Sequence, residues 1–215
     1  MIKIGVNMCG RFALSATTKD IEKLRPKLNI NTDITTSLNI APTQNILSIL
    51  SREPESLVYV KWGLIPSWSK DASIGNKMFN ARGETLHEKP SFKNLIKKRR
   101  CLILADSFYE WKKLDGKSKK QPYRISMEDD SIFCFGGLWD IWRDINDGRL
   151  VVTATIITTE PNEIMNEIHD RMPLIIENKF YDEWLDINTE DNWIRSIIKP
   201  YTDKNMKIEE YNFKQ

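Results

Sequence analysis

Met8-Cys9-Gly10-Arg11-Phe12 leads into the first predicted strand, at residues 10–13. We interpret Met8 as the functional start, so that removal of this methionine makes Cys9 the first residue. A terminal cysteine carries an α-amine and a thiol, which together can capture an aldehyde as an imine and then as a thiazolidine ring. An α-amine has a pKa of about 7.7–8.0 and a lysine about 10.4, so the α-amine is far more often neutral and nucleophilic near neutral pH. The alternative is that Cys9 is a small buried residue, as most free cysteines are.

Length and composition indicate one domain. A chain of 215 residues can bury a substantial core, and 40% hydrophobic with 29% charged residues is typical of a globular protein. We therefore expect residues 8–215 to form the domain and residues 1–7 to be an N-terminal extension or a mis-assigned start. No apolar run approaches the ~18–20 residues of a membrane span, so we expect no membrane partner.

The cysteines and histidines predict neither disulfides nor metal sites. Three widely spaced cysteines favour a reducing cytoplasm. Cys101 and Cys134 lie in apolar runs, where buried structural roles are expected. The two histidines, His87 and His169, form no metal-ligand spacing with the cysteines or with each other, so no metal and no cofactor are expected.

The charge is unevenly distributed along the chain. Residues 89–124 contain 12 Lys or Arg and 3 Asp or Glu, although the whole chain carries a formal charge of only +2. Such a segment can form a patch for a polyanion. It can equally be a solvated helix end followed by a lysine-rich hairpin.

The hydrophobic pattern predicts an α+β fold with many hairpin-connected, mainly antiparallel strands. Strands are expected at residues 46–50, 57–62, 101–106, 108–113, 123–127, 132–136, 138–143, 150–158 and 174–176, with an edge strand at 206–211. Helices are expected up to residue 24 and at 91–98, 161–168, 179–185 and 191–198. Residues 29–37 are expected to form a loop.

Two residues are candidates for proton transfer. Glu110 lies between Tyr109 and Trp111 in a predicted strand, where desolvation would raise its pKa toward neutrality. The alternative is that strand alternation points Glu110 to solvent. His169 follows a predicted helix and can either shuttle a proton or be a hydrogen-bonded group at the helix end.

A second group of residues can bind a nucleic acid. Asn80 and Arg82 alternate in an extended segment and would face the same side, where an amide and a guanidinium can bind a sugar and a phosphate. The alternative is a surface hydrogen bond and an ion pair. The apolar residues from Trp62 to Trp68 can lie in the core, or they can stack on bases if they are exposed.

Seven motifs occur in the order typical of one family. The chain closely resembles the SOS-response-associated peptidase (SRAP) family from residue 8 to about 176. The motifs are Met8-Cys9-Gly10-Arg11-Phe12, Asn39-Ile40-Ala41-Pro42-Thr43, Trp62-Gly63-Leu64-Ile65-Pro66-Ser67-Trp68, Asn80-Ala81-Arg82-Gly83-Glu84-Thr85, Phe108-Tyr109-Glu110-Trp111, Gly137-Leu138-Trp139 and His169-Asp170-Arg171-Met172-Pro173. The departures from the family pattern are the residues that precede Cys9 and, as a minor one, Gly83.

The resemblance implies a single SRAP-type domain with a curved, barrel-like, mainly antiparallel sheet flanked by helices. It implies a protein that binds single-stranded DNA and links covalently to abasic sites, with lyase and thiol autopeptidase activities as further family expectations. We expect a monomer that is cytoplasmic, and nucleoid-associated when it is bound to DNA. The implied catalytic residues are Cys9, Asn80, Glu110 and His169. The implied DNA-binding residues are Arg82, Pro42, Trp62, Pro66, Trp68 and Arg171.

Two other functions remain open at this point. A thiol peptidase would use Cys9 and His169, with Glu110 as a further candidate, and would cleave before Cys9 or cleave a peptide substrate. A non-catalytic module would bind normal and abasic strands equally and leave no adduct.

Overall fold

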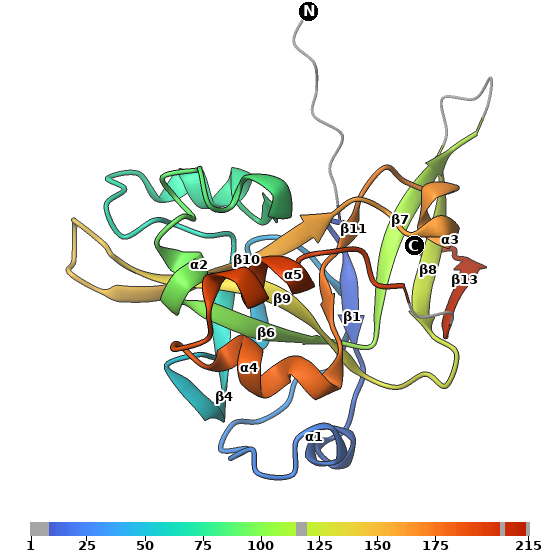
Figure 1. Cartoon of the computed structure of the whole chain (residues 1–215), viewed down its shortest axis with the longest axis horizontal. Helices are drawn as coiled ribbons and strands as arrows, with labels where there is room; N and C mark the ends of the chain where they lie inside the picture. Colours follow the sequence, from blue (N-terminus) through green and yellow to red (C-terminus); the bar gives the residue numbers. More distant parts are fainter. Residues whose placement is uncertain (1–8, 115–119, 203–204, 214–215) are drawn as a thin grey trace, which may run out of the picture.

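Five strands form a closed ring of pairings in the computed structural model, which describes residues 9–114, 120–202 and 205–213 (Figure 1). They are β3 (Asn45–Leu50), β4 (Glu53–Trp62), β6 (Arg100–Ala105), β9 (Phe133–Arg143) and β10 (Leu150–Thr159). The ring runs β4–β3–β6–β9–β10 and closes where β10 pairs with β4. The closing pair is parallel and the other four are antiparallel. A ring closed in this way removes the edge strands that an open sheet would expose.

Two glycines in the long strand β9 allow its neighbours in the barrel to pack closely against it. Every residue of β6 is buried, and β9 pairs with it along its first half. Two glycines lie in β9 at residues 136 and 137, and a Cβ at Gly137 would come within 2.7 Å of the Thr155 carbonyl oxygen. The missing side chain therefore allows β9 and β10 to approach each other, and β9 continues as one strand where two were expected.

Further strands extend this barrel and form a second sheet beside it. β5 (Asn80–Arg82) and β11 (Met172–Pro173) pair with β10, and β12 (Ile175–Ile176) pairs with β9. The second sheet has the order β13-β8-β7-β1-β2. Its strands are β1 (Phe12–Leu14), β2 (Ser37–Ile40), β7 (Ser107–Lys113), β8 (Lys120–Met127) and β13 (Met206–Glu210).

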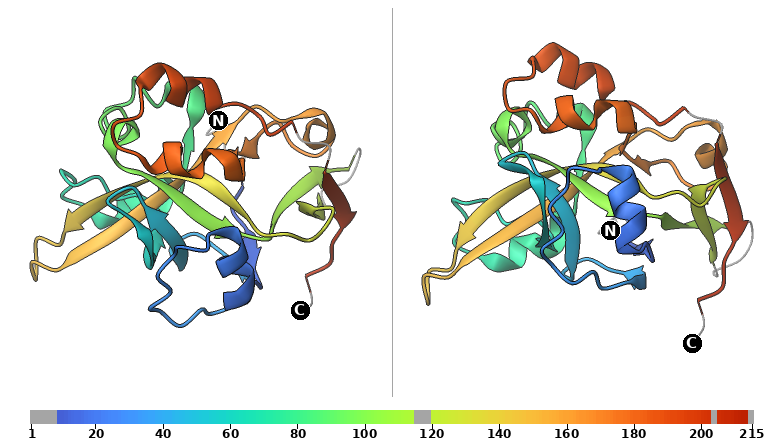
Figure 2. Two further views of the ribbon diagram at one scale, coloured as in Figure 1. Left: turned by 60° about the horizontal axis from the view of Figure 1, so that its bottom comes forward. Right: turned by 90° about the horizontal axis from the view of Figure 1, so that it is seen from below.

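Short helices cover the sheets. α4 and α5 lie together (Figure 2), and the end of α1 lies close to α4, because its C-cap residue Arg25 forms an ion pair with Asp182 of α4 at 2.8 Å. Thr17 and Asp20 form a capping box that begins α1. The helices are α1 (Thr18–Leu24), α2 (Leu95–Lys98), α3 (Glu163–Asn166), α4 (Tyr181–Leu185) and α5 (Asp191–Ile197), with 3-10 turns η1 (Ala72–Lys77), η2 (Gly83–Thr85) and η3 (Asn178–Phe180).

The predicted fold class, α+β with a curved, barrel-like, mainly antiparallel arrangement, is confirmed. The helices expected at 91–98 and 161–168 are shorter, since α2 and α3 each contain only four residues. The end of the segment expected as a loop at 29–37 joins β2, which pairs with β1. The expectation for residues 1–7 lies outside the described residues. Within the described part of the chain, no helix is long and apolar enough to cross a membrane.

Candidate active site

Cys9 lies just before β1, where the second sheet meets the barrel. Its side chain is 1% exposed. Its backbone nitrogen donates a hydrogen bond to Oε1 of Glu110 at 2.6 Å, and its carbonyl oxygen accepts one from Nδ2 of Asn80 at 3.3 Å. The φ angle of Cys9 is +25°, a region that non-glycine residues rarely occupy. Such a strained backbone conformation costs about 1–3 kcal/mol per residue, and residues that adopt one concentrate at functional sites.

Strand pairing places Glu110 beside Cys9. Phe12 of β1 is paired with Phe108 of β7, and the amide of Tyr109 donates to the carbonyl of Arg11 at 2.9 Å. This register brings the next residue of β7 opposite the segment that precedes β1. The side chain of Glu110 is 1% exposed, so the alternative in which it points to solvent is wrong.

The environment keeps the site protonated near neutral pH. Burial raises the pKa of Glu110 to about 8, with a further increase from Asp170, although the amides of Cys9 and Trp111 donate to this carboxyl. Burial, and then the charge of Glu110, raises the pKa of the Cys9 thiol well above its ordinary value. A carboxylic acid and an un-ionised thiol therefore lie side by side at pH 7.

Asn80 reaches Cys9 from the barrel side. It begins β5, which pairs in parallel with β10 so that Asn80 lies opposite Ile156. Phe79, the residue before Asn80, is held by Trp62, whose Nε1 donates a hydrogen bond to the Phe79 carbonyl oxygen at 2.8 Å. The two sheets therefore contribute one polar side chain each, Glu110 and Asn80, to the main chain of Cys9.

His169 and Arg171 lie between α3 and β11. The side chain of His169 is 7% exposed, and its Nδ1 accepts a hydrogen bond from the backbone amide of Arg171 at 3.1 Å. Burial lowers the pKa of His169, and the nearby charge of Asp170 opposes this change only in part. The ring is therefore neutral at pH 7. Its Nε2 is buried and has no hydrogen-bond partner among the residues that the structure describes.

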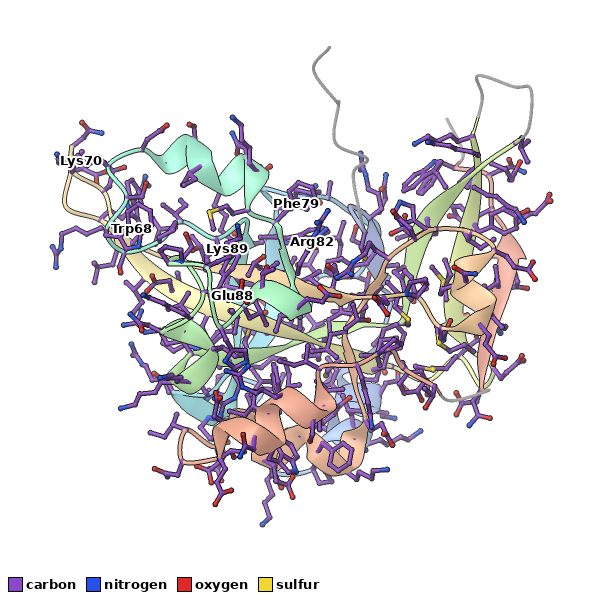
Figure 3. All side chains as sticks on the ribbon, turned by 45° about the horizontal axis from the view of Figure 1, so that its top comes forward. Trp68, Lys70, Phe79, Arg82, Glu88 and Lys89 are labelled. Atoms are coloured by element: carbon purple, nitrogen blue, oxygen red, sulfur yellow. The ribbon has the colours of Figure 1, made fainter. Side chains whose placement is uncertain are left out.

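The expected DNA-binding residues fall into exposed and buried groups. Arg82 and Trp68 are exposed, Trp68 by 63%, and they lie on one face with Lys70 and Phe79 (Figure 3). Trp62 is 0% exposed, which favours the core alternative for this residue. Its ring packs edge-on against Phe79 at a centroid distance of 6.1 Å and supports that half-buried ring from behind.

Three other expected DNA-binding residues differ in exposure and contacts. Pro66 is buried and Pro42 is half-buried. Arg171 is 12% exposed and forms an ion pair with Glu84 rather than a free surface cation. Arg82 and Trp68 are therefore the two expected DNA-binding residues that are exposed.

The loop that carries Trp68 is anchored to the barrel by side chains. Oδ2 of the buried Asp140 accepts a hydrogen bond from the amide of Ser67 at 2.8 Å. The amide of Ile65 donates to Oγ1 of Thr153 at 2.9 Å, and Nε1 of Trp142 donates to the carbonyl of Ser69 at 2.7 Å. These bonds hold an exposed tryptophan on a fixed main chain.

Three residues that contribute to the site were not expected from the sequence. They are Glu84, Asp140 and Phe79. Glu84 lies within one of the seven motifs, which is the signal that could have identified it. Asp140 directly follows the Gly137-Leu138-Trp139 motif, but neither its burial nor its partner is encoded locally.

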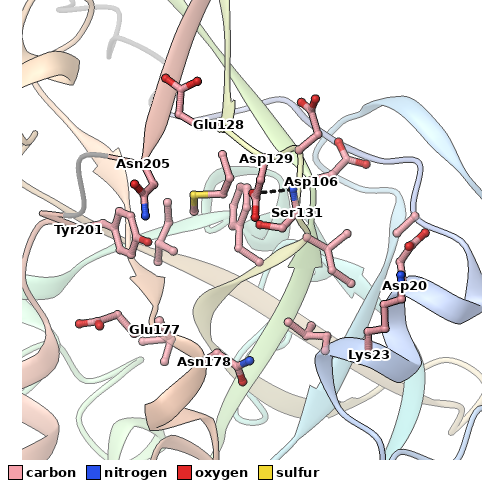
Figure 4. Close-up of a pocket in the computed structure, with 18 of the residues that line it drawn as sticks. Asp20, Lys23, Asp106, Glu128, Asp129, Ser131, Glu177, Asn178, Tyr201 and Asn205 are labelled. Atoms are coloured by element: carbon pink, nitrogen blue, oxygen red, sulfur yellow. Dashed lines mark hydrogen bonds between the residues drawn. The ribbon is translucent and has the colours of Figure 1, made fainter.

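A separate pocket of about 860 Å³ lies near the other end of β1, between α1 and the β8–β9 connection (Figure 4). None of the candidate site residues lines it. Asp106 is the most buried carboxylate in its wall and accepts hydrogen bonds from Ser15 and Ser107. Within the described residues, no group of three or more His, Cys, Asp or Glu side chains is placed to hold a metal ion.

Comparison with known families decides the relationship that the motifs indicate. The model of the family described as SOS response associated peptidase (SRAP) matches residues 8–212. The chain belongs to the SRAP family.

Relatives of this SRAP chain are named for one activity. Abasic site processing protein YoqW of Bacillus subtilis is 45% identical over 207 residues, which cover 93% of this chain and 90% of the relative. Abasic site processing protein HMCES of Xenopus tropicalis is 36% identical over 152 residues, covering 60% of this chain and 45% of the relative. The crystal structure of a protein from Bacteroides thetaiotaomicron has a TM-score of 0.87 at 26% identity, and the match covers 95% of this SRAP chain and 92% of that protein.

Proposed function

We propose that this protein processes abasic sites in single-stranded DNA by covalent capture through Cys9. The observation that carries the proposal is the position of the Cys9 nitrogen, 2.6 Å from a buried carboxyl group whose pKa is about 8. An abasic deoxyribose opens to an aldehyde, which is the electrophile that a terminal cysteine captures. The SRAP relatives named as abasic site processing proteins support the same substrate.

The chemistry balances without any oxidant or reductant. The neutral amine of Cys9 adds to the aldehyde carbon to give a carbinolamine. Glu110 donates its proton to the leaving hydroxyl, and water departs as the protonated imine forms. The thiol of Cys9 then adds to the carbon of the protonated imine, its proton returns to the Glu110 carboxylate, and the neutral thiazolidine ring is complete. One water is lost overall.

The other residues bind and position the substrate in this proposal. Asn80 fixes the carbonyl of Cys9 and lies where the deoxyribose would enter. Nε2 of the neutral His169 carries the free N–H and donates to a sugar oxygen during ring opening. Arg82 binds a flanking phosphate, and Trp68 stacks on a neighbouring base. Pro42, Pro66 and Trp62 support this surface from within.

The proposal requires a free amine on Cys9. While residues 1–8 remain attached, the nitrogen of Cys9 is part of an amide and cannot form an imine. Translation from Met8 with methionine removal, or cleavage before Cys9, supplies the required terminus. The intact mass of the purified protein distinguishes the processed chain from the unprocessed one.

A cysteine-peptidase function is less well supported by this geometry. A peptidase of this kind needs an activated thiolate, usually paired with a histidine. Here the Cys9 thiol is buried and its pKa is raised. Removal of residues 1–8 remains testable by mass.

Incubation of the processed protein with an oligonucleotide that contains one abasic site tests the proposal. We expect a heat-stable adduct whose mass is the sum of both partners minus one water. Cys9→Ser should give only an imine that borohydride can trap, because the amine is retained and the thiol is lost. Absence of a wild-type adduct, or an adduct that survives Cys9→Ala unchanged, would contradict the proposal. Equal binding of normal and abasic strands without any adduct would instead indicate a binding module.

A further inference from the structure

Glu84 and Arg171 form a two-point ion pair beside the candidate site. Nη1 of Arg171 donates to Oε1 of Glu84 at 2.6 Å, and Nη2 donates to Oε2 at 2.9 Å. Nη2 also donates to the carbonyl oxygen of Thr158 at 2.7 Å. A fork of this kind fixes the direction of a guanidinium more strongly than a single contact does.

The strand register explains why these residues meet. Thr158 of β10 lies opposite Arg82 of β5, and the following residue of β10 lies opposite Met172 of β11. Glu84 follows β5 by two residues, and Arg171 directly precedes β11. The ion pair therefore ties the ends of two strands to the same position on β10.

Arg171, held in this way, determines which nitrogen of the His169 ring carries the proton. The backbone amide of Arg171 donates to Nδ1 of His169, so this nitrogen must be unprotonated in a neutral ring. The proton then lies on Nε2, which is buried and has no hydrogen-bond partner among the described residues. A buried N–H donor without a partner costs free energy unless a ligand accepts from it.

Asp170 competes for the same nitrogen. Its Oδ1 lies 3.0 Å from Nδ1 of His169, a contact that would favour the proton on Nδ1. Asp170 is 84% exposed, so its side chain is weakly held, whereas the amide of Arg171 belongs to a main chain fixed next to β11. The position of Arg171 therefore decides which nitrogen carries the proton.

We infer that Glu84 is a positioning residue, which holds Arg171 so that its backbone amide keeps the His169 proton on Nε2, available to the substrate. The relevance of this role to DNA chemistry rests on the proposed function, whereas the effect of Glu84 on the His169 tautomer does not depend on it.

The same carboxylate should weaken the binding of DNA. Glu84 is 46% exposed and lies close enough to Arg82 for their charges to interact. Partial burial raises the pKa of Glu84, but the hydrogen bond and charge of Arg171 outweigh burial and lower it overall, so Glu84 is ionised at pH 7. A negative charge beside a phosphate-binding arginine repels the DNA backbone. Removing the charge of Glu84 should therefore impair the positioning of Arg171 but strengthen the binding of DNA.

Glu84→Gln tests the inference through two independent measurements. In the free protein, 15N-NMR of labelled histidine reports the tautomer, and the chain has only two histidines. The other, His87, faces Asp191 at 3.4 Å and serves as an internal reference. We expect His169 of the wild type to carry its proton on Nε2, and the variant to shift population toward a proton on Nδ1.

The second measurement separates reaction from binding. With saturating abasic oligonucleotide we expect Glu84→Gln to slow adduct formation about tenfold, a fraction of the ~10²–10⁴-fold that a general acid or base contributes. Its affinity for an undamaged single strand should increase about threefold at low salt, because one repulsive charge is removed.

Glu88→Gln is the matched control. Glu88 is exposed on the same face as Arg82 and carries the same charge as Glu84 (Figure 3). This variant should keep the wild-type tautomer and the wild-type rate.

Three outcomes would overturn the inference. One is an unchanged His169 tautomer in Glu84→Gln, and another is an unchanged rate. The third is a parallel loss of rate, affinity and thermal stability, which would show that Glu84 is only structural. If the wild type forms no adduct, the proposed function fails, while the tautomer measurement still decides the role of Glu84.

Discussion

At the scale of single residues, the site depends on two groups that titrate close together. A terminal amine has a pKa of about 7.7–8.0, and the Glu110 carboxyl that accepts its hydrogen bond has a pKa of about 8. In the proposed reaction the amine must lose its proton to attack, and Glu110 must keep its proton to release water. Because the groups are in contact, the two apparent pKa values belong to the pair.

The first prediction is a bell-shaped pH dependence of adduct formation. The rate should rise with pH as the amine becomes neutral, and fall above about pH 8 as Glu110 loses its proton. Glu110→Gln should lower the maximum by roughly 10²-fold and remove the alkaline decline, while DNA affinity stays near that of the wild type. Single-turnover rates measured from acidic to alkaline pH check this. An alkaline decline that persists in the Gln variant would assign it to another group.

At the scale of elements, the loop from Gly63 to Ser69 presents Trp68 on a fixed main chain. Gly63 has a φ angle of +126°, and a Cβ at this position would collide with the carbonyl of Gly75. The turn therefore requires glycine, and the bonds from Asp140, Thr153 and Trp142 hold the rest of the loop against the barrel. Little main-chain conformational entropy would therefore be lost if a base stacked on this ring.

The second prediction concerns this exposed ring. Trp68→Ala should weaken single-stranded DNA binding by about 1–2 kcal/mol, or roughly tenfold, because one stacked base is worth about 1–3 kcal/mol. The melting temperature should not change, since Trp68 is 63% exposed. Leu150→Ala, at a residue that is 57% exposed on β10, is the control and should leave binding unchanged. Fluorescence anisotropy with a labelled oligonucleotide measures both, and equal losses would contradict a specific role for Trp68.

The sequence predicts these elements better than it predicts their contacts. The sequence predicts β3, β6 and β10 from apolar runs that are mostly buried in the barrel, and β4 from the β-branched and aromatic residues at 57–62. Alternation in β7 places Glu110 and Tyr109 on opposite faces. Alternation does not reveal that both faces of β7 are covered. The face that carries Tyr109 packs against Tyr211 and Phe213. The parallel pairing of β10 with β5 depends on residues far apart in sequence, so the meeting of Asn80 with Cys9 followed from family resemblance and not from pattern.

At the scale of the whole molecule, one arginine joins parts that are distant in sequence. Arg100 is completely buried although it ends a run of four basic residues. It donates to the carbonyls of Ile96 and Lys97 at 2.7 Å, of Trp184 at 2.6 Å, and of Asp186. Burial lowers its pKa to about 10. The basic segment therefore offers fewer cations to a polyanion than its composition indicates, because Arg99 is also paired, with Asp140.

The third prediction concerns the four carbonyl contacts of this arginine. Arg100→Lys keeps the charge but cannot reach all four acceptors, so buried carbonyls lose their partners. We expect a loss of about 3 kcal/mol in the free energy of unfolding, and a melting temperature lower by about 6–12 °C. Arg99→Lys, at a side chain that is 38% exposed, should cost much less. Thermal unfolding of both variants measures this, and similar stabilities would show that Arg100 does not connect α2 to α4.

The depth at which Cys9 lies has a consequence for how long the protein survives in a stressed cell. Oxidants attack cysteines according to their thiolate fraction and their accessibility. With 1% of Cys9 exposed and the pKa of its thiol raised, both factors are small. Oxidants that damage DNA would inactivate an open, ionised thiol before it met its target. Under the proposed function, this concealment preserves the nucleophile under the conditions that generate its substrate, and a DNA strand would have to contribute binding energy to reach it.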